Sequence, residues 1–184
     1  MVVLYVVLGI ILLLAIFVCT EYNKFVRLKN RIEESFSQLD ATLKKRFDLI
    51  PNLVETVKGY ASHEKETLEN VINARNNGMN AKTLEEVDSA SKSMTNALGR
   101  LFALSESYPD LKANASFTSL QNTLNKMEDE ILASRKYYNA VVKQYNTAVE
   151  TFPSNIVAKM FGYKRKGYLE IDEKERENVK VSFS

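Results

Sequence analysis

The first twenty residues of the chain, Met1 to Thr20, contain no charged side chain. Each residue of a helix adds about 1.5 Å, so this segment would be roughly 30 Å long, which is the thickness of the hydrocarbon layer of a bilayer. We therefore predict a transmembrane anchor over residues 1–20 and expect the lipid bilayer to be a partner of this chain.

A cleaved secretory signal is the alternative to a retained anchor. Such a signal carries Lys or Arg before its apolar core and small residues at its cleavage site. Nothing basic precedes Val2, and the bulky residues Ile16 to Val18 stand before Cys19, where a lipoprotein peptidase requires a small residue. These features favour an uncleaved anchor over cleavage or lipidation.

Basic residues closely follow the apolar segment, whereas none lies on its N-terminal side. The residues concerned are Lys24, Arg27, Lys29 and Arg31. The positive-inside rule then predicts a single-pass protein of the cell membrane with the bulk of its chain in the cytoplasm. Tyr22 occupies the position of an interfacial aromatic residue.

Composition narrows what the remaining residues can do. The net charge of +2 provides no long-range attraction to nucleic acid, so we expect no nucleic-acid partner. Cys19 is the single cysteine and lies in the predicted bilayer, which leaves no thiol for catalysis or metal binding elsewhere. His63 is the single histidine, and a zinc site needs ligands that this sequence lacks. The sequence contains no Gly-rich phosphate loop and no nucleophile next to a base. We therefore predict that the protein is not an enzyme and that it binds no cofactor and no metal.

Apolar residues recur at steps of three or four from Phe25 to Ile50, as on one face of a helix. We predict that the transmembrane helix continues without a break into this segment. Pro51 then either ends the helix or occupies the first turn of the next one. The next helix is expected to run from about Pro51 to Arg75, with Gly59 in close contact with another backbone and an end at Asn76 to Gly78.

Further helices are predicted along the rest of the chain. Thr83 and Glu86 have the spacing of a capping box at the start of one helix, which breaks near Tyr108-Pro109. A long helix follows and ends before Pro153. A short amphipathic piece is capped by Ser154 and closed by Gly162. Since each helix has one apolar stripe, we predict an all-α fold with an elongated antiparallel helical bundle over residues 21–162, continuous with the anchor. A charged C-terminal tail follows over residues 163–184, and we expect it to be extended or disordered in isolation from Gly167 on.

Four groups of polar residues are candidates for contacts with partners. Asp48, Asn52 and Glu55 flank Pro51 and either cap a helix start or contact a partner. Tyr108 and Asp110 belong to a segment that forms either a defined turn or an exposed interaction loop.

Asn139 and Asn146 lie seven residues apart on one helix face. Together with Asn23 from the first helix, they either form a polar layer that sets the register between helices or occupy a solvated or tyrosine-bonded edge.

Basic residues near the membrane either contact anionic lipid, at about 1 kcal/mol each, or belong to an ordinary solvated surface. These are Lys24, Arg27, Lys164, Arg165 and Lys166.

Several motifs in this order resemble the LemA family of bacterial membrane proteins. They are Asp48 to Glu55 with Lys58 to Ala61, Tyr108 to Asn114 followed by Phe117, and Arg135, Tyr138-Asn139, Tyr145-Asn146 and Phe152-Pro153. Tyr22-Asn23 matches as well. The resemblance implies an N-terminal anchor and a helical soluble domain, and it implies no particular catalytic activity. It also implies a similarity to components of membrane remodelling and a genetic neighbourhood with membrane metalloproteases.

Two functions follow as hypotheses. The first is a homo-oligomeric scaffold that organises or remodels the membrane, because a rod that leaves lipid and enters a bundle with a polar seam can set the register of an assembly. The second is an adaptor that holds another membrane protein, such as a protease, without forming oligomers.

Overall fold

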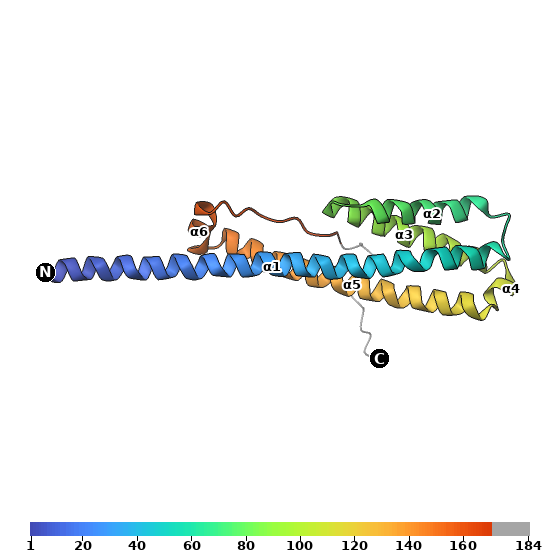
Figure 1. The fold of residues 1–184 in the computed structure, drawn as a ribbon, viewed down its shortest axis with the longest axis horizontal. Helices are drawn as coiled ribbons and strands as arrows, with labels where there is room; N and C mark the ends of the chain where they lie inside the picture. Colours follow the sequence, from blue (N-terminus) through green and yellow to red (C-terminus); the bar gives the residue numbers. More distant parts are fainter. Residues whose placement is uncertain (171–184) are drawn as a thin grey trace, which may run out of the picture. The chain divides into compact units, whose positions relative to one another are not determined.

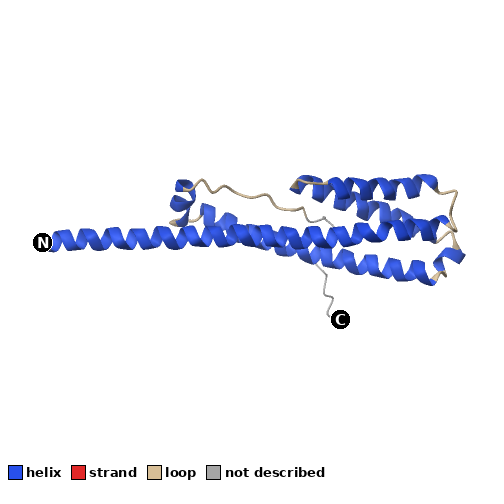
Figure 2. Cartoon of the chain, in the orientation of Figure 1, coloured by secondary structure: helices blue, strands red, loops and turns tan. Residues whose placement is uncertain are grey.

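The computed structural model describes residues 1–170 and confirms the all-α fold. Its helices are α1 (Val2–Lys58), α2 (Lys65–Asn80), α3 (Leu84–Ser105), α4 (Pro109–Lys112), α5 (Ala115–Glu150) and α6 (Ser154–Met160). No strand occurs within these residues, as Figure 2 shows. Residues 171–184 of the predicted charged tail lie outside the described residues.

The chain divides into two compact units. The first unit contains residues 1–37 and 136–168, and the second contains residues 38–135 together with the segment that begins at Leu169. The helices α1 and α5 each supply residues to both units. The predicted domain boundaries at residues 20 and 162 remain predictions.

The helix α1 is continuous, as predicted, but it also passes through Pro51 and ends only at Lys58. The prediction that Pro51 ends this helix or starts the next was wrong. A proline in a helix has no N–H to donate to the carbonyl four residues earlier, here that of Phe47. The Arg75 side chain replaces this donor, because its Nε lies 3.0 Å from the Phe47 carbonyl oxygen. A contact from α2 thus compensates for the hydrogen bond that Pro51 removes.

The second unit has an apolar core to which α1, α2, α3, α4 and α5 all contribute. Figure 1 shows α2 and α3 side by side in this unit. Fully buried side chains include Leu39, Ile50, Leu53, Val71, Met94, Leu101, Leu111, Phe117, Leu124 and Ile131. Each such side chain contributes about 1.5–3 kcal/mol through its burial, which offsets the conformational entropy of ordering these helices.

Two glycines have roles that differ from the predicted ones. Gly78 does not end α2, which continues to Asn80; a Cβ atom at Gly78 would lie only 2.2 Å from Cζ of Phe47. This glycine therefore allows α2 to approach the Phe47 ring. Gly59 follows the last residue of α1, and a Cβ there would have only the Thr56 carbonyl oxygen within 4 Å among the described residues. The prediction that Gly59 lies in close contact with another backbone was therefore wrong.

The ends of the other helices largely follow the prediction. Thr83 and Glu86 form the capping box of α3, with both hydrogen bonds present. The helix α5 has 36 residues and ends before Pro153. Gly162 closes α6 with a φ of 72°, a conformation that glycine adopts without strain. Ser154 is the first residue of α6 instead of its cap, and its hydroxyl donates to the carbonyl oxygens of Ala148 and Thr151.

Candidate membrane-proximal site

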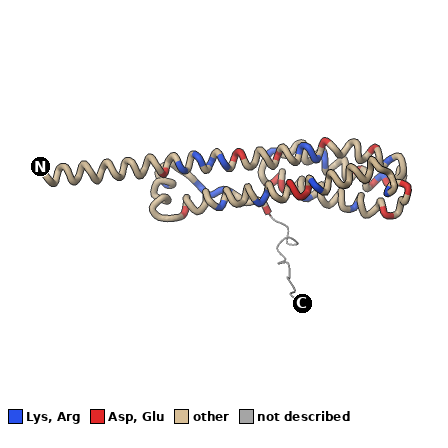
Figure 3. The backbone as a smooth tube through the Cα atoms, turned by 90° about the horizontal axis from the view of Figure 1, so that it is seen from below, with Lys and Arg blue, Asp and Glu red and all other residues tan. Residues whose placement is uncertain are grey.

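The N-terminal part of α1 has the properties of a membrane-spanning helix. None of the side chains in its apolar part is buried, and Figure 3 shows no charged residue along it. By length and composition this is the one helix of the described residues that could cross a membrane. The side chains are exposed up to Ile16 and first become partly covered at Phe17 and Val18.

An aromatic cluster, formed by Tyr22, Phe25, Tyr145, Phe161 and Tyr163, lies directly after this apolar part. The Phe25 ring stacks on Tyr163 at a centroid distance of 4.7 Å and meets Tyr145 edge-on at 6.1 Å. Phe161 reaches within 4.8 Å of Tyr22. Aromatic pairs in these arrangements contribute about 0.5–1.5 kcal/mol each beyond their burial. The cluster therefore holds α5 and the residues after α6 against α1 at the level of Tyr22.

Burial raises the pKa of Tyr145, and the neighbouring Tyr163 raises it further, while a hydrogen bond with the Lys164 backbone opposes the shift. Burial likewise raises the pKa of Tyr163, with Tyr22 adding to the effect. The phenols of Tyr145 and Tyr163 are therefore neutral at physiological pH.

Asn146 binds the segment that follows α6. Its side-chain amide donates to the Lys166 carbonyl oxygen at 2.9 Å and accepts from the Lys166 amide at the same distance. The Tyr138 hydroxyl contacts the Gly167 carbonyl oxygen at 3.4 Å. Asn146 is buried, so these two bonds satisfy an amide that would otherwise be costly to bury.

The predicted polar layer between helices therefore differs from the observed arrangement. Asn23 is exposed, and Asn146 pairs with a backbone instead of a second helix. Asn139, which is partly buried, directly follows Tyr138 on the same helix and also takes part in an interaction. On α5, Asn146 and Tyr138 both hold the segment after α6 through its backbone.

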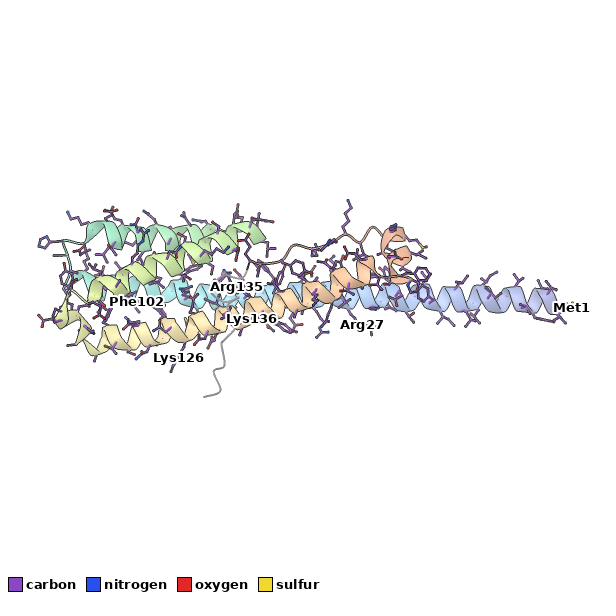
Figure 4. The ribbon with its side chains drawn as sticks, turned by 180° about the vertical axis from the view of Figure 1, so that it is seen from behind. Met1, Arg27, Phe102, Lys126, Arg135 and Lys136 are labelled. Carbon is purple, nitrogen blue, oxygen red and sulfur yellow. The ribbon has the colours of Figure 1, made fainter. Side chains whose placement is uncertain are left out.

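The predicted lipid-contact residues all belong to the first unit. Lys24 pairs with Glu21 at 3.1 Å, and Arg165 pairs with Glu150 at 3.0 Å. The side chains of Arg27, Lys164 and Lys166 are exposed, and Figure 4 marks Arg27 on α1.

Asp48, Pro51, Asn52 and Glu55 form an exposed stripe on α1, which we call the α1 stripe. The interpretation of these residues as helix caps was wrong, because no helix begins there. Their spacing of three, four and seven residues places them on one helix face. A contact with a partner stays a prediction for this stripe.

Tyr108 and Asp110 lie at the connection between α3 and α5, which contains the single helical turn α4. The Tyr108 hydroxyl donates to Glu64 at 2.9 Å, and this hydrogen bond, followed by burial, raises the pKa of Tyr108. Asn114 donates to the Tyr60 hydroxyl at 3.0 Å. Both bonds join this connection to the turn after α1. Asp110 is exposed, and its role in a contact remains a prediction.

Arg46 is a buried charge that sequence reasoning missed. It is 2 % exposed, and its Nη2 lies 2.6 Å from Oε2 of Glu128, while Nη1 donates to Thr95 at 3.2 Å. Burial lowers the pKa of Arg46, the Glu128 carboxylate raises it, and Arg135 lowers it further. The available signal was its spacing, since Arg46 continues the alternating steps of four and three residues set by Leu39, Leu43, Ile50 and Leu53.

A second group of charges links α3 to α5. Asp88 lies 3.0 Å from Arg135 and 3.1 Å from Lys92, and all three side chains are mostly covered. Lys92 and Arg135 also contact Glu170, at its side chain and carbonyl oxygen respectively. The Glu170 and Asp88 hydrogen bonds raise the pKa of Lys92, with the Glu170 bond the larger cause and burial opposing. These pairs give the second unit a structural ionic network.

Comparison with known proteins places most of this chain in one family. The profile of the LemA family matches residues 35–183. The chain is 29% identical over 164 residues to "Protein LemA" of Metamycoplasma hominis, with 87% of this chain and 74% of that protein covered.

The chain is also 26% identical to two proteins named for the magnetosome. These are "Magnetosome protein MamQ 2" of Paramagnetospirillum magneticum, over 175 residues and 81% of this chain, and "Magnetosome protein MamQ" of Magnetospirillum gryphiswaldense, over 173 residues and 80% of this chain. The matched region spans 64% of each of these relatives. Because the family profile covers most of the chain, this protein belongs to the LemA family.

Proposed function

We propose that this protein is a non-enzymatic membrane scaffold. It is anchored in the cell membrane through the apolar part of α1, holds its other helices in the cytoplasm, and associates with further copies of itself to organise or remodel the bilayer. The observation that carries the proposal is the continuity of α1. One unbroken helix contains both the apolar segment and core residues as far as Val57. Two copies that associate through their soluble helices therefore also bring their apolar segments together.

The α1 stripe supports self-association. Its carboxylates and amide are exposed, and none of them is needed to cap a helix. Such groups form hydrogen bonds and ion pairs across the polar parts of interfaces. The similarity to proteins named for the magnetosome supports a role in association with a membrane.

Site-directed crosslinking in native membranes tests the proposal. In a Cys19→Ser background, Asn52→Cys places a thiol on the α1 stripe, and Lys126→Cys places a matched control on an exposed position of α5 (Figure 4). Oxidation should join two copies through residue 52 and leave the residue 126 variant as single chains.

A strictly monomeric protein in native-lipid discs, with no self-adduct at residue 52, would contradict the scaffold. Adducts of residue 52 with a different membrane protein, and few with itself, would support the adaptor hypothesis in its place.

A further inference from the structure

Four large apolar side chains are exposed on α6 and beside it. Phe152 is 75% exposed, Met160 64%, Ile156 51% and Phe161 48%. The opposite side of α6 is covered, since Ser154, Val157 and Ala158 are buried. The helix α6 thus packs on the first unit through one face and exposes a second, apolar face that includes Ile156 and Met160, with Phe152 and Phe161 beside it.

The aromatic cluster defines the level of this apolar face along α1. Phe161 lies 4.8 Å from Tyr22, ring to ring. Tyr22 is two residues beyond Thr20, which corresponds to about 3 Å along a helix axis. The interfacial layer on each side of a hydrocarbon core is about 5–7 Å thick, so Phe161 lies within that layer when residues 1–20 span the bilayer.

The burial of α1 agrees with this level. Partial covering of α1 begins at Phe17 and Val18, inside the apolar segment. The segments that pack on α1 in this unit therefore overlap the C-terminal end of the apolar segment by two or three residues, or about 4 Å along the helix axis. Figure 1 shows α6 next to the C-terminal end of α5, on the side toward the N-terminus of α1.

The charges around α6 have the sign expected beside a membrane. Lys159 is exposed on α6 itself, and Lys164, Arg165 and Lys166 follow it. An interfacial helix combines an apolar face, buried about 5–10 Å into the headgroup region, with basic residues that face the headgroups.

We infer that α6, with Phe152 and Phe161, is a second membrane contact that inserts into the interfacial layer of the leaflet where α1 leaves the bilayer. Its occupant is the lipid of that leaflet, because the level set by Tyr22 and the partial burial of Phe17 place the exposed apolar face there. This inference rests on the membrane anchoring in the proposed function, but it does not depend on self-association. A wedge beside the span in one leaflet would give the scaffold a means to bend the bilayer.

Tryptophan quenching in proteoliposomes tests the inference. The chain contains no Trp, so Phe152→Trp introduces a single probe into the full-length protein. The vesicles contain phosphatidylcholine and phosphatidylglycerol at a ratio of 3:1, with or without brominated acyl chains. Tyr137→Trp is the matched control, since Tyr137 is exposed in the same unit and its neighbour Tyr138 meets Phe36 at 6.1 Å, sixteen residues and about 24 Å beyond Thr20.

Brominated lipid should quench the probe at position 152 at least twofold more than the probe at position 137. The emission of the probe at position 152 should also lie further to the blue. Equal, weak quenching of both probes in vesicles that retain the protein after alkaline extraction would overturn the inference and leave the anchor intact. Loss of the protein from the vesicles on extraction would overturn the anchor, and with it both proposals.

A second variant tests whether the apolar face itself carries the contact. Phe152→Trp combined with Ile156→Asp and Met160→Asp should lose most of the quenching while its helical circular dichroism is unchanged. Quenching that persists at full strength in this variant would overturn the assignment of the contact to α6.

Discussion

Gly78 lies where α2 meets the ring of Phe47. Replacing a glycine inside a helix with alanine usually stabilises a protein, but this contact reverses the expected sign at Gly78. Gly78→Ala should lower the free energy of unfolding by about 1–3 kcal/mol, because the new methyl group forces the ring or the helix to move. Gly99→Ala is the matched control in α3, where a Cβ has nothing within 4 Å among the described residues. It should stabilise the protein by about 0.5–1 kcal/mol. Chemical denaturation measures both, and equal stabilisation by the two substitutions would contradict the contact.

Arg46 and Glu128 should respond unequally to substitution. Glu128→Gln leaves a buried guanidinium without its counterion and should lower the free energy of unfolding by about 2–3 kcal/mol. The loss is smaller than for breaking a fully buried ion pair, because the Glu128 side chain is 42% exposed. Arg46→Met removes the buried charge, including an Nε that has no hydrogen-bond partner among the described residues. It should cost less than about 1.5 kcal/mol. Thermal unfolding compares the two, and a larger loss from Arg46→Met would contradict this account of the pair.

The Arg75 contact with α1 predicts an energetic coupling between α2 and Pro51. Arg75→Met should cost about 1 kcal/mol, since it leaves the Phe47 carbonyl without a donor. In a Pro51→Ala background the backbone amide restored at position 51 can donate to that carbonyl, so the same substitution should have a smaller effect. A double-mutant cycle measures the coupling. Full additivity of the two changes would show that Arg75 does not compensate for the proline.

At the scale of the element, the start of α3 gives a pH-dependent prediction. The Glu86 carboxylate accepts hydrogen bonds from the backbone amides of Lys82 and Thr83, and these bonds lower the pKa of Glu86. A carboxyl group whose pKa is lower in the folded state stabilises the protein above its unfolded pKa and loses this effect as the pH falls through the folded pKa.

Glu86→Gln should therefore lower the Tm at neutral pH, and its difference from the parent should shrink below about pH 4. Glu85→Gln is the control, because it removes a charge from the same helical turn without breaking the capping box. Differential scanning calorimetry across the pH range provides the measurement. A Tm difference that is constant between neutral and acidic pH would rule out the carboxylate as its source.

For the whole molecule, the basic residues that follow the apolar segment predict its sidedness. Alkaline phosphatase fused after Ser184 should be inactive, and a green fluorescent protein at the same place should be fluorescent, because both would lie in the cytoplasm. Replacing the cations between residues 24 and 31 with glutamine should raise the phosphatase activity. High phosphatase activity in the unmodified fusion would place the helices on the other side of the membrane.

The sequence by itself determined the helical class, the apolar N-terminal segment, the capping box of α3 and the end of α5 before Pro153. Each of these depends on contacts within a few residues or on the spacing of apolar side chains, and both can be seen in a linear pattern. The tertiary structure alone decided the course of α1 through Pro51, the contact that requires a glycine at position 78, the counterion of Arg46 and the partner of Asn146. In these cases a residue distant in the chain supplies the missing donor, the ring, the counterion or the backbone, so local preference is overruled by a contact that spacing alone does not reveal.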